Sequence, residues 1–347
     1  MSSQKGDCWK CTGTGRKYSK KTRLYDGDEC GVCSGTGFYA RRVEPDTLPP
    51  GVIPPCEGSD RVPGLTRQQE APFDLLPQKG EIIAPFGCGW RIYQIARGHK
   101  LTSDDLLTAN VCCEAIKSKF RKGVRRIRHI DLGCGCGSVL LAVARFARHI
   151  GMAIESFGVE AQEVSHHCCE RGIFWNGIET TTRVDLHDLR TWKGPPPPSQ
   201  SVEWVLLSGT PPYFAASSFV PSPGDIQKLP CRMLVRGQAI DYAIKATGLM
   251  RDASVPTDLV LVDASRNESI MDQWMSGHTS DWRQVRRVRV IPKTSKPPRF
   301  TIWQWKRSVD QAPAFDDTTL TIRDASNKYT PAYEKTLIDV GYKESYS

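Results

Sequence analysis

The sequence predicts an α/β protein built on a mostly parallel β-sheet, and three observations support this fold class. A short apolar strand ends at Asp131 and runs directly into a glycine-rich turn, and an apolar helix follows the turn. Two further short strands lead to acids, Glu160 and Asp188. The order strand, glycine turn, helix, strand, acid, helix, strand, acid is typical of nucleotide-binding α/β folds.

The elements of this fold can be placed along the chain in order. Helices are expected at 139–150, at 231–250 and from Glu268 onward. The last two expected strands alternate polar and apolar residues, as an antiparallel pair does. Together with five earlier strands they give a mostly parallel, seven-stranded sheet closed by an antiparallel terminal hairpin. The seven expected strands are 127–131, 155–159, 183–186, 203–208, 257–264, 284–291 and 300–306.

The glycine turn has the spacing D-x-G-x-G-x-G rather than the dinucleotide spacing G-x-G-x-x-G. Gly133 and Gly135 allow the backbone to approach a ligand closely. Glu160, at the tip of the second strand, can accept hydrogen bonds from both ribose hydroxyls. Asp188, after the third strand, is placed to meet an adenine edge. The spacing therefore predicts a nucleoside cofactor.

The fourth strand ends in Thr210-Pro211-Pro212-Tyr213-Phe214. Ligands meet catalytic groups at the carboxyl ends of parallel strands, and two prolines fix the backbone there. An aromatic side chain directly after the prolines can stack on a flat substrate such as a base. We interpret this segment as the catalytic site, although taken alone it also fits a plain Pro-Pro turn with a packed tyrosine.

Two copies of the pattern C-x-x-C-x-G-x-G, at 8–15 and 30–37, lie at the front of the chain. Cys8, Cys11, Cys30 and Cys33 would present four thiolates, which suits tetrahedral, structural zinc. The pattern resembles the cysteine-rich repeats of DnaJ-type chaperones. Four free thiols are the alternative. The basic loop at 16–23 between the copies fits a contact with RNA or with protein.

The 347-residue chain has a formal net charge of +9, which favours polyanionic partners such as nucleic acid. Solvated surface faces are an equally good interpretation of any one basic cluster. The three clusters are Arg16, Lys17, Lys20, Lys21 and Arg23; Lys117, Lys119, Arg121, Lys122, Arg125, Arg126 and Arg128; and Arg283, Arg286, Arg287 and Arg289.

Cysteine usage indicates the compartment. The chain has 13 cysteines, several of them adjacent to one another or inside the glycine turn, where they make poor disulfide partners. The N-terminus is polar and lacks the apolar region of a signal peptide. We expect an intracellular reducing compartment, the cytoplasm first and the mitochondrion as the alternative. No apolar stretch is long enough to span a bilayer, so no membrane partner is expected.

The chain is similar to the bacterial tRNA adenine-N6 methyltransferases that modify an adenine beside the anticodon of a valine tRNA. The resemblance covers roughly residues 85–340. It rests on the segment 93–109, in which Asp104 matches an acid that lies over the cofactor, and on a closing segment at 320–331. The residues that match the cofactor site of the family are Asp131, Gly133, Gly135, Glu160 and Asp188.

The resemblance implies a Rossmann-like class I methyltransferase fold and S-adenosylmethionine as the cofactor. It also implies an RNA partner, tRNA or rRNA, either free or within a ribonucleoprotein. We expect a zinc module at 1–44, which lies outside the pattern of this family, and a proline- and glycine-rich linker at 45–84. A methyltransferase domain at 85–310 and a C-terminal extension at 311–347 complete the expected domains.

One departure from the family concerns catalysis. The family carries Asn-Pro-Pro-Tyr, sometimes with Asp first, where this chain has Thr210. The asparagine amide oxygen accepts a hydrogen bond from the target amino group, and threonine offers only a shorter hydroxyl acceptor. Three hypotheses follow: an RNA methyltransferase with a weakened catalytic motif, a catalytically silent relative that acts as an RNA-binding, assembly or structural factor, and a protein glutamine methyltransferase.

Overall fold

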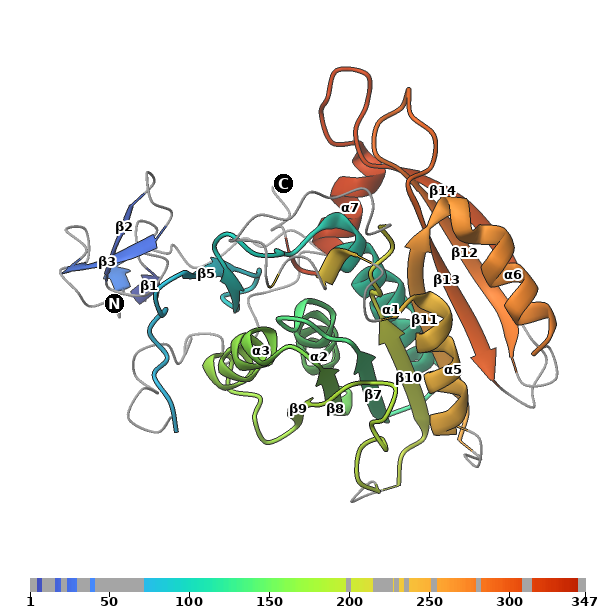
Figure 1. The fold of residues 1–347 in the computed structure, drawn as a ribbon, viewed down its shortest axis with the longest axis horizontal. Coiled ribbons are helices and arrows are strands. Elements are labelled where there is room, and N and C mark those ends of the chain that lie inside the picture. The colour runs from blue at the N-terminus through green and yellow to red at the C-terminus, as the bar shows by residue number, and fades with distance from the viewer. Residues whose placement is uncertain are drawn as a thin grey trace.

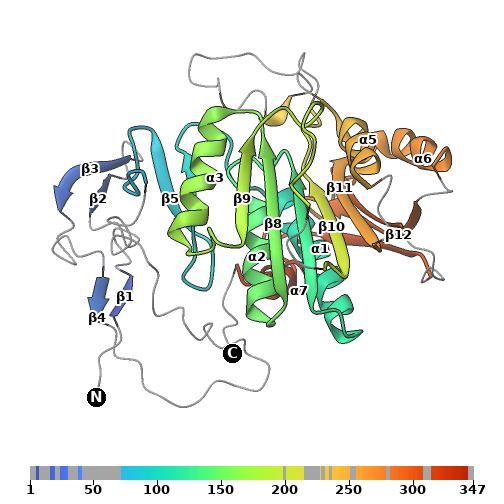
Figure 2. The ribbon, with the colours of Figure 1, turned by 90° about the horizontal axis from the view of Figure 1, so that it is seen from below.

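The computed structural model describes residues 72–197, 201–214, 227, 231–233, 237–250, 255–278, 282–307 and 314–342, with the backbone of four short strands before them. An eight-stranded sheet forms the centre, in the order β14-β12-β13-β11-β10-β7-β8-β9. Figure 2 shows several of these strands side by side. Their bounds are β7 Arg126–Leu132, β8 Ala153–Glu160, β9 Thr182–Leu186, β10 Trp204–Gly209, β11 Thr257–Ala264, β12 Arg283–Ile291, β13 Phe300–Arg307 and β14 Asp316–Thr321.

Strands β9, β8, β7, β10 and β11 are parallel to one another. Strand β13 is antiparallel to both of its neighbours, β11 and β12. The sheet is mostly parallel and Rossmann-like with an antiparallel pair toward one side, so the predicted fold class of this sheet is confirmed. The sheet has one strand more than expected, because β14 pairs in parallel with the edge strand β12. The sequence of β14, Asp-Asp-Thr-Thr-Leu-Thr, carries no apolar alternation that could have revealed it.

Side chains of the central strands alternate between two cores on opposite faces of the sheet. On β10, Leu206 belongs to one cluster and Val205 and Leu207 belong to the other. Alternation with a period of two puts neighbouring residues on opposite faces. Both faces are covered, so the middle of β10 (Trp204–Gly209) and of β11 (Thr257–Ala264) is a continuous apolar run, as parallel strands usually are. The helices are α1 Ser103–Arg121, α2 Ser138–His149, α3 Glu163–Trp175, α5 Ala239–Met250, η3 Ser265–Asn267, α6 Glu268–Ser276 and α7 Pro331–Asp339.

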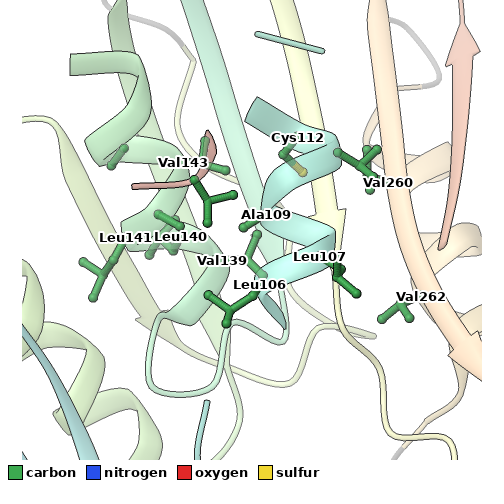
Figure 3. Packing of buried hydrophobic residues seen from close by; sticks show 14 of the residues in the cluster. Leu106, Leu107, Ala109, Cys112, Val139, Leu140, Leu141, Val143, Val260 and Val262 are labelled. Carbon is green, nitrogen blue, oxygen red and sulfur yellow. The ribbon is translucent and has the colours of Figure 1, made fainter. Parts of the chain in front are cut away.

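Helix α1 is the centre of the larger core (Figure 3). It lies between α2, which presents Val139 and Val143, and β11, which presents Val260 and Val262. Its first turn is closed by a capping box, in which the backbone N–H of Thr102 donates to the carboxylate of Asp105 at 3.0 Å. The box fixes where α1 begins, next to the glycine turn. Helices α5 and α6 cover the other face of the sheet (Figure 1).

A short hairpin precedes the sheet. Strands β5 (Glu81–Pro85) and β6 (Arg91–Ile95) pair antiparallel and pack against α3. Arg171 of α3 is fully buried and forms an ion pair with Glu81, and its guanidinium lies 4.4 Å from the ring centroid of Tyr93. A buried charge of this kind needs a partner. The expected linker 45–84 therefore overlaps a strand that is tied into the core.

Helix α5 begins at Ala239, eight residues later than the helix expected at 231–250. Gly237 precedes it with φ of +149°, a conformation that a helix does not contain. Near the N-terminus, β1 (Lys5–Asp7) pairs antiparallel with β4 (Phe38–Ala40), and β2 (Arg16–Ser19) pairs with β3 (Leu24–Glu29). In the part of the chain that the structure describes, no helix combines the length and the hydrophobicity that crossing a membrane requires.

Candidate functional site

The glycine turn joins β7 to α2, and its glycines adopt left-handed backbone conformations, with φ of +64° at Gly133 and +57° at Gly135. A Cβ atom on Gly133 would lie 2.3 Å from the hydroxyl oxygen of Tyr242, so only glycine fits there. A Cβ on Gly135 would meet no atom within 4 Å. The turn is thus packed on one side, by Tyr242 of α5, and open on the other.

The carboxylate of Glu160 ties the turn to the end of β8. One oxygen accepts a hydrogen bond from the backbone N–H of Gly135 at 3.0 Å, and the other accepts from the backbone N–H of Gln162 at 2.7 Å. Glu160 is only 7% exposed, and it lines a cavity.

That cavity, here the first cavity, brings together most of the predicted cofactor residues. Gly133, Gly135, Glu160 and Asp188 all line it, and Thr210 closes one side. Other lining residues were not expected from the sequence; they include Gln94, His99, Asp105, Gln162, Gln227 and Tyr242.

A second cavity adjoins the first. Pro211, Tyr213 and Phe214 line it together with Asp104. Thr210 and Pro212 line both cavities, as do Asp105, His99 and Cys231. The two cavities therefore meet at the end of β10, where the sequence placed the catalytic segment.

Asp131 lines neither cavity. It is 2% exposed, beneath the turn, and accepts a hydrogen bond of 2.6 Å from the hydroxyl of Ser208 on β10. His129 Nε2 lies 2.9 Å from the same hydroxyl. Burial raises the pKa of Asp131 to about 7 and lowers that of His129 to about 3. The structure thus places Asp131 in a buried network that holds β7 against β10.

The two acids at the start of α1 have different positions. Asp104 lies in the second cavity and accepts a hydrogen bond of 2.8 Å from the hydroxyl of Tyr213. Asp105 lines both cavities and, among the described residues, is the one carboxylate that does so. Burial, with a contribution from Asp104, raises the pKa of Asp105 to about 7. Sequence reasoning selected Asp104 and missed Asp105.

Asp188 of the first cavity is partly exposed and forms an ion pair with Arg190, whose Nε donates a hydrogen bond to Oδ1 at 2.9 Å.

Tyr213 and Phe214 are the aromatic residues that follow the two prolines. Burial and the neighbouring Asp104 raise the pKa of Tyr213, and the centroid of its ring lies 4.8 Å from that of Phe214. Tyr213 is therefore a buried, anchored side chain, and Phe214 is the more exposed aromatic of the second cavity.

The expected zinc ligands Cys8, Cys11, Cys30 and Cys33 lie outside the described residues. Within the described ranges, no group of three or more His, Cys, Asp or Glu side chains could hold a metal ion. The zinc module therefore stays a prediction from the sequence.

No protein-family model matches the chain. No curated protein matches it either. Among solved structures, the chain is similar to a predicted O-methyltransferase from Agrobacterium tumefaciens, with 15% identity, 70% of this chain and 100% of that chain covered, and a TM-score of 0.43.

Two further solved structures are similar to the chain. One is from Listeria monocytogenes and is assigned to the class I S-adenosylmethionine-dependent methyltransferases, with 14% identity, 71% of this chain and 74% of that chain covered, and a TM-score of 0.45. The other is the hMettl16 catalytic domain, solved with the MAT2A 3′UTR hairpin 1, with 14% identity, 74% and 83% covered, and a TM-score of 0.45. Similarity at this level is confined to the fold and assigns no substrate to this chain.

Replacing Gly133 by alanine tests the packing of the turn. We expect Gly133→Ala to lower the free energy of unfolding by roughly 2–4 kcal/mol, because a strained φ adds to a clash with Tyr242. Gly123→Ala is the matched control: its φ is +92° but no atom lies within 4 Å, so a loss of about 1 kcal/mol is expected. Denaturant unfolding measures both, and equal losses would contradict this packing.

The buried acids predict a pH dependence of stability. Asp131 has a pKa of about 7 when folded and an ordinary value of 3.8, so between these values the folded state binds more protons than the unfolded state. The contribution of Asp131 to stability therefore falls as the pH rises from about 4 to about 7. Asp131→Asn keeps an acceptor for Ser208 and removes this contribution, on the order of 4 kcal/mol.

Unfolding of wild type and Asp131→Asn between pH 4.5 and pH 7.5 would measure the effect, in steps of about half a unit. Asp105, whose pKa is raised to about 7, and His129, whose pKa is lowered to about 3, contribute slopes of opposite sign that both proteins share. The prediction therefore concerns the difference: the stability of wild type relative to Asp131→Asn should fall as the pH rises toward 7. An unchanged difference would mean that Asp131 is ionised in the folded protein throughout this range.

Proposed function

We propose that this chain is an S-adenosylmethionine-dependent methyltransferase that acts on an amino nitrogen of an RNA base, with adenine N6 of a tRNA or rRNA as the target. The observation that carries the proposal is the meeting of the two cavities at Thr210 and Pro212. The first has a glycine turn and a strand-tip carboxylate, which suit a nucleoside. The second has prolines and an aromatic ring, which suit a flat base.

The residues of the first cavity fit the cofactor. Gly135 leaves open space beside the turn, since a Cβ there would meet no neighbour. Glu160 would accept hydrogen bonds from the ribose hydroxyls. Asp188, which is ion-paired with Arg190, would face the adenine edge. When bound, S-adenosylmethionine supplies a methyl group on a positively charged sulfur. The task of the protein is then to position the target and to exclude water.

The residues at the junction would orient the target nitrogen. The Thr210 hydroxyl and the Pro211 carbonyl can both accept hydrogen bonds from an amino group. The nitrogen must release one proton when it gains a methyl group. Asp105 faces both cavities and, with a pKa of about 7, is half ionised near neutral pH and able to accept that proton.

A catalytically silent relative that binds RNA as an assembly or structural factor is the second candidate. Thr210 favours it, because a threonine hydroxyl reaches less far than the asparagine amide of the resembled family. The glycine turn and the inward-facing Glu160 favour the active enzyme, since a protein that only binds RNA does not need a nucleoside pocket.

Methyl transfer from labelled S-adenosylmethionine to total tRNA and rRNA tests the proposal. We expect transfer by the wild-type protein, and about a tenfold loss of kcat in Thr210→Val, because the variant has nearly the same shape but no hydroxyl acceptor. Thr210→Asn should keep or raise the activity.

Two outcomes would count against this proposal. Activity that is unchanged in Thr210→Val would show that the hydroxyl does not orient the target. A wild-type protein that transfers no methyl group, while Thr210→Asn does, would identify the native chain as the silent relative.

A further inference from the structure

Two arginines in the second cavity, Arg232 and Arg299, have guanidinium groups that no acid neutralises within the described part of the chain. The Cζ atom of Arg232 lies 5.1 Å from the ring centroid of Phe214, and that of Arg299 lies 5.7 Å from it. No salt bridge or side-chain hydrogen bond of either guanidinium occurs among the described residues. Two guanidinium groups therefore lie near the ring of Phe214, and all three side chains line the second cavity.

The basic run on β12 has the opposite character. Arg286 pairs with Glu114 and, at 3.1 Å, with Asp316. Arg289 pairs with Glu268 at 2.9 Å and with Asp317 at 2.8 Å.

Arg287 of the same strand also forms an ion pair with Asp317. Basic residues beside β7 are paired as well, Arg128 with Glu155 and Arg126 with Glu203. A polyanion that bound these arginines would have to compete with carboxylates already in place. These paired arginines of β7 and β12 are therefore poorer phosphate sites than the two arginines beside Phe214.

An arginine held over an aromatic ring keeps its N–H edge available. The cation–π contact uses the flat face of the guanidinium, and the donors along its edge match the oxygens of a phosphate. Neither acid of this cavity forms a salt bridge with these arginines among the described residues. Asp104 accepts hydrogen bonds from the hydroxyls of Tyr213 and Thr102, and Asp105 accepts one from the backbone N–H of Thr102. The arrangement thus offers two donor edges to one anion.

We propose that Arg232 and Arg299 clamp the phosphate next to the target base, so that the substrate of the second cavity is a nucleotide within a phosphodiester chain. This inference rests on the proposed function, since it names the substrate class of the same site. Phe214 keeps the two guanidinium groups in place, and Pro211 and Pro212 border the space that the base would enter. A protein glutamine side chain carries no phosphate and would leave the clamp without a ligand.

Equilibrium binding to the full chain, saturated with S-adenosylhomocysteine, tests the clamp without any need for methyl transfer. The probes are adenosine and the trinucleotide triadenylate, whose central adenosine has a phosphate on either side. The variants are Arg232→Gln and Arg299→Gln. Arg323→Gln is the matched control, because Arg323 also lies over an aromatic ring, 4.2 Å from the centroid of Tyr329, but lines neither cavity.

Wild type should bind triadenylate at least about tenfold more tightly than adenosine, as charge-assisted hydrogen bonds to phosphate predict. Each clamp variant should lose about tenfold in affinity for triadenylate and nothing for adenosine. The dependence of triadenylate affinity on salt should also become shallower in each variant, by about one phosphate contact. Arg323→Gln should bind both probes like wild type, and melting temperatures would confirm that every variant folds.

The clamp is wrong if both variants bind triadenylate as the control does, if wild type binds triadenylate no better than adenosine, or if wild type prefers a Gly-Gly-Gln peptide. Failure of the proposed function gives a different result. If the wild type transfers no methyl group but the affinity for triadenylate falls in the two variants, the phosphate clamp is supported and the proposed enzymatic function is wrong. If the wild type methylates RNA and both variants have the same KM for RNA as the wild type, the proposed enzymatic function is supported and the phosphate clamp is wrong.

Discussion

The carboxylate of Glu160 is the contact on which the geometry of the site depends. It accepts the backbone N–H of Gly135 from one side and that of Gln162 from the other, and so fixes the glycine turn relative to the tip of β8. A buried carboxylate is costly unless it is hydrogen-bonded, and these two amides offset that cost. With the turn held open in this way, α1 and the end of β10 complete the walls of both cavities.

Much of the fold could be predicted from the sequence, since β10 and β11 contain continuous apolar runs and β7 leads directly into a glycine-rich turn. The strand expected at 257–264 coincides with β11, and the first strand, expected at 127–131, differs from β7 by one residue at each end. The sequence could not reveal β14, which is polar and is held to β12 largely by backbone pairing and arginine–aspartate contacts. Nor could it reveal the hairpin β5–β6, whose burial depends on the distant Arg171.

The site was predictable where its residues follow one another along the chain, and less so where distant segments meet. Gly133, Gly135, Glu160, Asp188 and Thr210 come together in one cavity, whereas Asp131, which was also expected there, is buried beneath the turn and lines neither cavity. Asp105 could have been found, because Thr102 and Asp105 have the spacing of a capping box. Tyr242, Arg232 and Arg299 gave no local signal, because the space left by Gly133 and the ring of Phe214 exist only in the folded chain.

Calorimetric titration of the protein with S-adenosylmethionine tests the central claim most directly, namely that the glycine turn and Glu160 form a nucleoside pocket. We expect one site per chain in the wild type, and at least a tenfold weaker affinity in Glu160→Ala, which removes the acceptor for the ribose. Glu163→Ala, three residues away on an exposed part of α3, should bind like the wild type. Absence of binding, or equal affinity in Glu160→Ala and the wild type, would contradict the account.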